Sequence, residues 1–247
     1  MEAHVAQWLG RREKQEDAYA ARPVAGGMLA VVCDGMGGHC FGDCASRAAA
    51  TAFADAFAAQ ESADLTGRLQ TALEAANAAV RSVYESQGAF GGTTLLAVFT
   101  RRGLLHWISV GDSPLYLWRM GRLLRLNADH SMRAVFERYV CAGGMTLREA
   151  QRNGHMLRSA LTGSRIPLVD APSVGYPLLP GDRLILCTDG TDSLLAQGVL
   201  LPELRDLLNE RGGSLAAHLV EACRELNEEH ADNVTVITLD VAFSTVQ

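Results

Sequence analysis

The chain has 247 residues, of which 48% are hydrophobic, so it can bury a large core, and disordered and low-complexity classes of protein are excluded. Its 28 acidic residues outnumber the 22 basic residues and give a formal net charge of -6. Without an overall positive field, neither nucleic acid nor an anionic membrane is an expected partner. The length predicts a single domain over residues 1–247.

The lysine and cysteine content excludes further classes of protein. Lys14 is the only lysine, and no Ser or Thr follows it, so a nucleotide-binding P-loop is absent. The six cysteines include no Cys-x-x-Cys pair, which indicates buried thiols in a reducing compartment. The first residues lack the features of a signal peptide, and no apolar run approaches the roughly 20 residues that cross a bilayer. We therefore expect a soluble cytoplasmic protein.

Short runs rich in valine, isoleucine and leucine predict the strands. In chain order they cover residues 18–22, 28–33, 94–100, 104–110, 115–118, 183–188 and 234–241. Only Arg101, Arg102 and Gly103 separate two of these runs, and Met120 and Gly121 interrupt residues 115–126. Such short interruptions predict antiparallel hairpins at both places.

Apolar residues at helical spacing predict helices between these strands. Two amphipathic helices are expected within residues 46–86, with a break near 62–67, and further helices at 201–211 and 214–229. Residues 131–172 are less periodic and contain several glycines and prolines, so we interpret them as an irregular insertion. Strands in hairpins and helices in pairs favour an α+β fold of packed layers.

Aspartates recur at the ends of the predicted strands. Four that lie within two residues of a strand end are Asp34, Asp112, Asp189 and Asp232. Each alone can be an ordinary turn residue, but carboxylates that converge on one sheet edge repel each other unless a cation neutralises them. Because only oxygen donors are in view, Mg²⁺ or Mn²⁺ is favoured over Zn²⁺. The repeated placement favours a metal cluster.

The segment before the strand at 18–22 adds charged groups to this edge. Glu16 and Asp17 form either a solvated charge cluster or a fifth acidic position. Arg11 and Arg12 place planar cations beside them, and a guanidinium suits bidentate capture of phosphate. The residues by themselves therefore predict a metal-assisted hydrolase of phosphate esters.

The motifs that contain these residues resemble, in the same order, those of the metal-dependent Ser/Thr protein phosphatases, the PPM or type 2C family, in its bacterial form. They are REKQED at 12–17, DGMGGHCFGDCAS at 34–46, GGTT at 91–94, VGDS at 110–113, DHS at 129–131, PGDR at 180–183, CTDG at 187–190 and DNVT at 232–235. The resemblance covers nearly the whole chain. It implies a four-layer α-β-β-α sandwich with two central antiparallel sheets, in which residues 131–172 correspond to the flap that shapes substrate access.

The resemblance also implies a site for two Mn²⁺ or Mg²⁺ ions, with a third, weaker ion position beside it. The metal ligands that it assigns are Asp17, Asp34, Gly35 through its carbonyl, Asp112, Asp189 and Asp232, and Glu16 supports them from behind. Asp34 is expected to bridge the two main ions. Asp112 and Asp189 are expected to face the third.

The implied activity is hydrolysis of phosphoserine and phosphothreonine in proteins by a metal-activated water, without a phosphoenzyme. Arg12, Asp34 and Asp189 are the predicted catalytic residues, with Arg12 holding the phosphate oxygens. The open alternatives are a pseudophosphatase that serves as a regulatory binding module and a two-metal hydrolase of small phosphate esters. Phosphorylated proteins are the expected substrates, an opposing Ser/Thr protein kinase is the expected counterpart, and a monomer is expected.

The sequence departs from the family pattern at several positions. Gln15 stands where Asn is common, Pro114 stands where Arg usually follows GDS, and residues 155–161 match only loosely. Pro114 removes a donor near the third ion position.

The histidines and two cysteines near these motifs receive structural interpretations. They are His39 as a loop residue, His130 and His155 as packing or capping groups, and Cys40 and Cys44 as small residues where a helix begins. A redox function of the two cysteines and a general acid role of His39 stay open.

Overall fold

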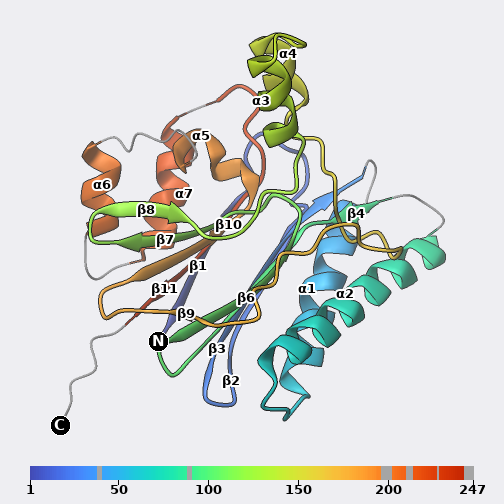
Figure 1. The fold of residues 1–247 in the computed structure, drawn as a ribbon, viewed down its shortest axis with the longest axis vertical. Coiled ribbons are helices and arrows are strands. Elements are labelled where there is room, and N and C mark those ends of the chain that lie inside the picture. The colour runs from blue at the N-terminus through green and yellow to red at the C-terminus, as the bar shows by residue number, and fades with distance from the viewer. Residues whose placement is uncertain (38–40, 88–90, 196–201, 210–213, 227, 242–247) are drawn as a thin grey trace.

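The computed structural model describes residues 1–37, 41–87, 91–195, 202–209, 214–226 and 228–241, and its centre consists of two antiparallel sheets (Figure 1). The first sheet has the order β1 (Ala3–Trp8), β11 (Val234–Asp240), β10 (Arg183–Cys187), β7 (Leu115–Arg119), β8 (Arg122–Arg125). The second has the order β2 (Asp17–Val24), β3 (Gly27–Met36), β5 (Leu95–Arg101), β6 (Leu104–Val110), β9 (Tyr176–Pro177), and β4 (Gly92–Thr93) pairs with the end of β3.

Helices cover the outer face of each sheet, which completes four layers (Figure 1). The second sheet is covered by α1 (Gly42–Ala58) and α2 (Leu65–Gln87), and the first by α5 (Asp192–Leu195), α6 (Pro202–Asn209) and α7 (Leu215–Glu225). Two further helices, α3 (Arg133–Cys141) and α4 (Leu147–Asn153), stand out at one end of the sandwich. The predicted α-β-β-α sandwich is thus observed.

Three apolar layers hold the sandwich together: one between the sheets, and one between each sheet and its helices. Strand β3 contributes to two of them. Leu29 and Val31 face α1 and α2, whereas Ala30 and Val32 face the other sheet. Because side chains alternate between the two faces of a strand and both faces here are buried, the strand reads as one continuous apolar run.

The two predicted hairpins are observed. Arg102 and Gly103 join β5 to β6 with φ of 51° and 75°, and Met120 and Gly121 join β7 to β8 with φ of 50° and 75°. Positive φ at both central residues is typical of the tight turn whose twist matches antiparallel strands. In residues 131–172, where an irregular insertion is expected, the structure contains the short helices α3 and α4.

The antiparallel order of the strands brings the acidic residues to one end of both sheets. Asp17 begins β2 and lies opposite Asp34 near the end of β3. Asp112 follows β6, Asp189 follows β10, and Asp232 precedes β11, which runs antiparallel to β10. The strand ends therefore meet as the sequence predicts.

Within the described ranges, no helix is long and apolar enough to cross a membrane.

Candidate metal and phosphate site

A cleft of about 720 Å³ opens where these strand ends meet. Its lining combines carboxylates from both sheets with groups from the N-terminal segment and from the segment that follows α4. The sequence-predicted residues that line it are Arg12, Glu16, Asp34, Gly35, Asp112, Asp189 and Asp232. Asp17 is the exception, because its side chain lies buried beneath the cleft.

Asp34 is held by the two threonines of the GGTT motif. Its backbone amide donates to the Thr94 hydroxyl at 2.9 Å, and its carbonyl accepts from the Thr93 hydroxyl at 2.9 Å. The Thr94 hydroxyl also lies 2.7 Å from that of Ser113, which links β3 to the turn that carries Asp112. These contacts explain why the sequence has hydroxyl side chains at this point.

Gly35 lies where no side chain fits. A Cβ atom there would stand 2.1 Å from the Gly42 carbonyl oxygen and 2.6 Å from that of Glu16. The close approach lets the Gly35 amide donate to the Glu16 carbonyl at 3.1 Å, and this bond ties β3 to the segment before β2.

Asp17 binds two hydroxyls of the other sheet. Its Oδ2 accepts from Thr235 Oγ1 at 2.6 Å and from Thr188 Oγ1 at 2.9 Å. Burial nevertheless raises the pKa of Asp17 to about 7, because the two hydrogen bonds only partly offset the loss of water and Asp189 is a further negative charge. The motifs CTDG and DNVT thus contribute two threonines that hold Asp17, a function that the motifs by themselves do not reveal.

Asn233 organises the N-terminal segment. Its Nδ2 donates to the carbonyls of Leu9 and Lys14 at 2.8 and 3.0 Å, and its Oδ1 accepts from the Glu16 amide at 2.8 Å. The side chain therefore holds the segment that carries Arg12 and Glu16 against β11. The DNVT motif marks Asn233 in the sequence, but only the folded chain shows which groups its amide binds.

At Asp34, Asp112 and Asp189 the surroundings disfavour the ionised form of the carboxyl group. Burial, followed by the charges of Asp189 and Asp17, raises the pKa of Asp34 well above its usual range. Burial and the charge of Asp189 raise the pKa of Asp112 to about 7. Burial also raises the pKa of Asp189, which shares a hydrogen bond with Asp34. Oxygen donors under such mutual repulsion are the set that a divalent cation stabilises, so the residues fit Mg²⁺ or Mn²⁺.

The carboxylates do not form a ready-made ion cage. Among the described residues, no three His, Cys, Asp or Glu side chains gather closely enough to hold one ion. Asp17 binds the two threonines, and Asp232 pairs with Arg12, whose Nη2 lies 2.5 Å from its Oδ2. Arg12, predicted to hold phosphate, is thus bonded to a predicted metal ligand.

Asp112 lies on a turn that β10 supports. The carbonyl of Pro114 accepts from the Cys187 amide at 3.2 Å, and the Asp112 carbonyl accepts from Arg125 Nη2 at 2.7 Å. Pro114 thus removes an arginine side chain without detaching the turn. His130, predicted to be a packing or capping group, is buried, and its Nδ1 accepts from the Gly111 amide at 3.2 Å.

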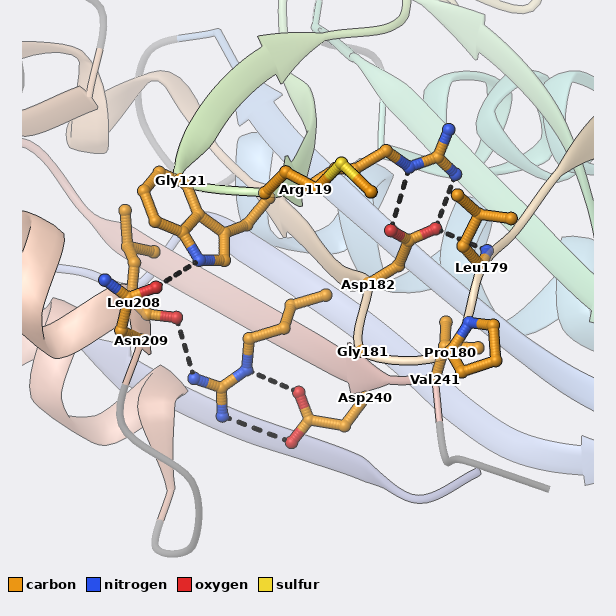
Figure 2. A pocket seen from close by; sticks show the side chains of 13 residues that line it. Arg119, Gly121, Leu179, Pro180, Gly181, Asp182, Leu208, Asn209, Asp240 and Val241 are labelled. Atoms are coloured by element: carbon orange, nitrogen blue, oxygen red, sulfur yellow. Dashed lines mark hydrogen bonds and ion pairs between the residues drawn. The ribbon is translucent and has the colours of Figure 1, made fainter. Parts of the chain in front are cut away.

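A second hollow, of about 430 Å³, lies at the opposite ends of β10 and β11 (Figure 2). Its charged groups bind each other: Arg119 pairs with Asp182 through both carboxylate oxygens, and Arg183 pairs with Asp240. Since these charges are mutually satisfied, the cleft with the carboxylates is the stronger candidate for chemistry.

A family model described as protein phosphatase 2C matches residues 9–234 of the chain. The chain belongs to the protein phosphatase 2C family. The family predicted from the motifs is therefore confirmed.

Relatives of this protein phosphatase 2C chain carry phosphatase names. Serine/threonine protein phosphatase PstP of Mycobacterium tuberculosis is 30% identical over 243 residues, which are 94% of this chain and 43% of PstP. The chain thus spans less than half the length of PstP. Serine/threonine phosphatase stp of Listeria monocytogenes is 25% identical over 221 residues, which are 86% of this chain and 84% of that protein.

Solved structures agree with the fold. The crystal structure of the M. tuberculosis serine/threonine phosphatase PstP/Ppp matches with a TM-score of 0.79 at 28% identity, covering 98% of this chain and 99% of that chain. The PstP catalytic domain in complex with two manganese ions matches with a TM-score of 0.76 at 28% identity, covering 98% of both chains. The predicted sandwich with two antiparallel sheets is confirmed.

The structure corrects one of the interpretations given to the histidines and cysteines near the cleft of this family member. His155, expected to pack or cap, is exposed and lines the cleft together with Met156 and Leu157. The segment that returns from α4 therefore forms one wall of the cleft. His39 and Cys40 lie outside the described residues, and Cys44 is a half-buried free thiol in the first turn of α1.

Proposed function

We propose that the chain is a Mn²⁺- or Mg²⁺-dependent phosphatase that hydrolyses phosphoserine and phosphothreonine in proteins. The observation that carries the proposal is the gathering of buried, mutually repelling carboxylates beside an arginine at one cleft. Membership of the protein phosphatase 2C family and the names of the relatives support the same activity.

The proposed metal ligands are carboxylates of the cleft with one backbone carbonyl: Asp34, Asp189, Asp232, Asp17, Asp112 and the carbonyl of Gly35. The manganese reported for the PstP catalytic domain supports two ions. When bound, divalent cations supply the positive charge that activates a water near neutral pH and offsets charge on the phosphate. We also propose a position for a third ion beside Asp112.

The chain's own side chains bind the phosphate and hold the metal ligands in position. Arg12 binds the non-bridging phosphate oxygens with its planar guanidinium, which is more than half exposed at the cleft mouth. Asn233 fixes the backbone on both sides of Arg12, so the guanidinium is kept within reach of the cleft mouth. Thr188 and Thr235 keep Asp17 in place beneath the cleft, and Thr93 and Thr94 do the same for Asp34. This order limits the rearrangement needed when phosphate binds.

We also propose a domain organisation, a cellular location and a counterpart for the protein. Residues 1–247 form one catalytic domain, in which residues 131–172 act as a flap over the cleft, supported by the position of 155–157 in its wall. The protein acts as a cytoplasmic monomer that opposes a Ser/Thr protein kinase. The five described cysteines are free thiols, which suits a reducing compartment.

The decisive experiment is phosphate release from a phosphothreonine peptide in Mn²⁺, in Mg²⁺ and in EDTA, for the wild type and Asp189→Asn. We expect release that requires the metal and is lost in the variant. If the folded wild-type protein releases no phosphate in either metal, the proposed activity is wrong and a non-catalytic binding function replaces it. Release from small esters alone would exclude the protein substrate.

A further inference from the structure

Residues 129–133, at the base of α3, contact two of the turns that carry cleft carboxylates. Figure 1 shows α3 and α4 standing out at the end of the sandwich where these turns lie. The base of this projection is anchored by backbone hydrogen bonds, from Met132 to the Met156 carbonyl at 2.8 Å and from Arg158 to the His130 carbonyl at 2.8 Å. The two ends of the projecting segment are therefore joined to each other next to the cleft.

One contact of this base is with the turn of Asp112. The His130 amide donates to the Gly111 carbonyl at 3.1 Å, and the Gly111 amide donates back to His130 Nδ1 at 3.2 Å. Arg125 bridges the same two segments, because it donates to the Asp112 carbonyl at 2.7 Å and to the Asp129 carboxylate at 3.0 Å. The Asp112 turn is thus held by several independent bonds.

The contact with the turn of Asp189 has a different character. Asp189 lies in the short helical turn Asp189–Thr191, and Asp192 directly follows it as the first residue of α5. The first residue of α3, Arg133, places its Nη2 2.5 Å from Asp192 Oδ2. The two side chains are 38% and 24% exposed, so the pair is partly withdrawn from solvent and less screened than a surface pair.

The charges around this pair make it more than a surface contact. Asp192 contributes negative charge at both Asp112 and Asp189, and Arg133 contributes the opposing charge at Asp189. Partial burial is the largest single influence on Arg133 and disfavours its charge, but the hydrogen bond to Asp192 and the charges of Asp192, Asp129 and Asp112 together outweigh it and raise the pKa of the guanidinium. Without Arg133, the Asp192 carboxylate would stand three residues from Asp189 without its partner, and its repulsion of the Asp189 carboxylate would no longer be opposed by the guanidinium.

We propose that Arg133 is a positioning residue that, through its ion pair with Asp192, holds the Asp189 turn in the place where Asp189 binds metal. This inference rests on the proposed function and names a residue outside the motifs that carry the family resemblance. It connects the projecting segment to metal binding through the Arg133–Asp192 ion pair. Groups that orient metal ligands from behind typically contribute 10- to 100-fold to metal affinity or activity.

The test measures Mn²⁺ binding by isothermal titration calorimetry, independently of activity, in Arg133→Ala, Arg133→Lys, Asp192→Asn and the double variant Arg133→Ala/Asp192→Asn. Arg138→Ala is the matched control, because Arg138 is an exposed residue of the same helix and, among the residues that the structure describes, its side chain donates to the Ala134 carbonyl one turn before it and to no other group. Circular dichroism and thermal melting verify that each variant is folded. Kinetics with a phosphothreonine peptide and with p-nitrophenyl phosphate follow.

We expect Arg133→Ala to weaken Mn²⁺ binding about 10-fold and to lower kcat for both substrates to a similar extent. Arg133→Lys should recover most of the affinity, and the double variant should be no worse than the worse single variant, because both changes break one interaction. Arg138→Ala should match the wild type.

Two results would overturn the inference. One is a folded Arg133→Ala protein whose Mn²⁺ affinity stays within about twofold of the wild type, well below the effect of an orienting group. The other is a higher KM for the peptide alone, which would make Arg133 a substrate contact. If the wild type releases no phosphate but the Mn²⁺ affinities change as described, the proposed function fails and the positioning of the metal ligand by Arg133 does not.

Discussion

Arg12 Nη2 and Asp232 Oδ2 lie 2.5 Å apart across the mouth of the cleft, so a side chain proposed to bind phosphate pairs with one proposed to bind metal. The two side chains are 54% and 39% exposed. A pair this exposed contributes only about 0–1 kcal/mol, so it exchanges readily for other partners. The arrangement implies that metal and Arg12 compete for Asp232, whereas phosphate and Asp232 compete for Arg12.

Replacement of Arg12 should therefore act in opposite directions on the two ligands. In Arg12→Ala, loss of a charged phosphate contact should reduce kcat/KM for a phosphothreonine peptide about 10- to 100-fold. Mn²⁺ affinity should be unchanged or increase by up to about fivefold, since the competing cation is gone. Steady-state kinetics and calorimetry measure the two effects. Arg11→Ala is the control, and a weaker Mn²⁺ affinity in Arg12→Ala would contradict this account.

Removal of one cleft carboxylate should abolish turnover while the fold survives. Asp189→Asn and Asp34→Asn each remove a proposed metal ligand together with a repelling charge, so we expect activity to fall at least about 100- to 1000-fold. The thermal midpoint in EDTA should not fall, because burial disfavours the ionised form of both groups. Asp206→Asn, on the exposed side of α6, provides the control. Activity within tenfold of the wild type would remove either residue from the proposed site.

The metal-free protein should lose stability as the pH rises through neutrality. Burial raises the pKa of Asp17 and of Asp112 to about 7, above the ordinary value of 3.8 that each has when unfolded. The folded state therefore binds more protons than the unfolded state between about pH 4 and 7, and the stability present below pH 4 declines across this range.

Thermal unfolding in EDTA at intervals from pH 5 to 8 tests this expectation. The midpoint should fall toward pH 8, Asp112→Asn should make the fall shallower, and saturating Mn²⁺ at pH 8 should restore the midpoint by binding the ionised form. A midpoint in EDTA that rises steadily over the same interval would show that these carboxylates are not held in unfavourable surroundings.

Asn233 should affect stability and catalysis together. Asn233→Ala removes three hydrogen bonds that hold the segment before β2, and the side chain is 4% exposed, so we expect a loss of about 2–3 kcal/mol in the free energy of unfolding. Peptide KM should rise because Arg12 is no longer oriented. Urea denaturation and kinetics measure the two effects. Asn153→Ala, which removes one bond within α4, should change stability by less than half as much.

Much of the fold could be read from local pattern. Buried strands such as β3 and β5 form continuous apolar runs because both faces are covered, and the Arg102-Gly103 and Met120-Gly121 turns carry the residues that tight hairpins need. The sequence pattern does not predict the strand Ala3–Trp8, because most of its residues are half-buried and small or polar. Tyr176–Pro177 has two residues and is too short for any period.

The sequence by itself determined the family, the layered fold and the acidic residues that meet at one end of the sheets, because each depends on residue type and order along the chain. Only the tertiary structure decided what those residues bind. Asp17 receives hydroxyls from residues 171 and 218 positions away, and Arg12 meets Asp232 across 220 positions. Arg133 reaches Asp192 from a helix whose sequence carries no family motif. Such contacts depend on how strands and turns pack in three dimensions, and local periodicity contains no information about that packing.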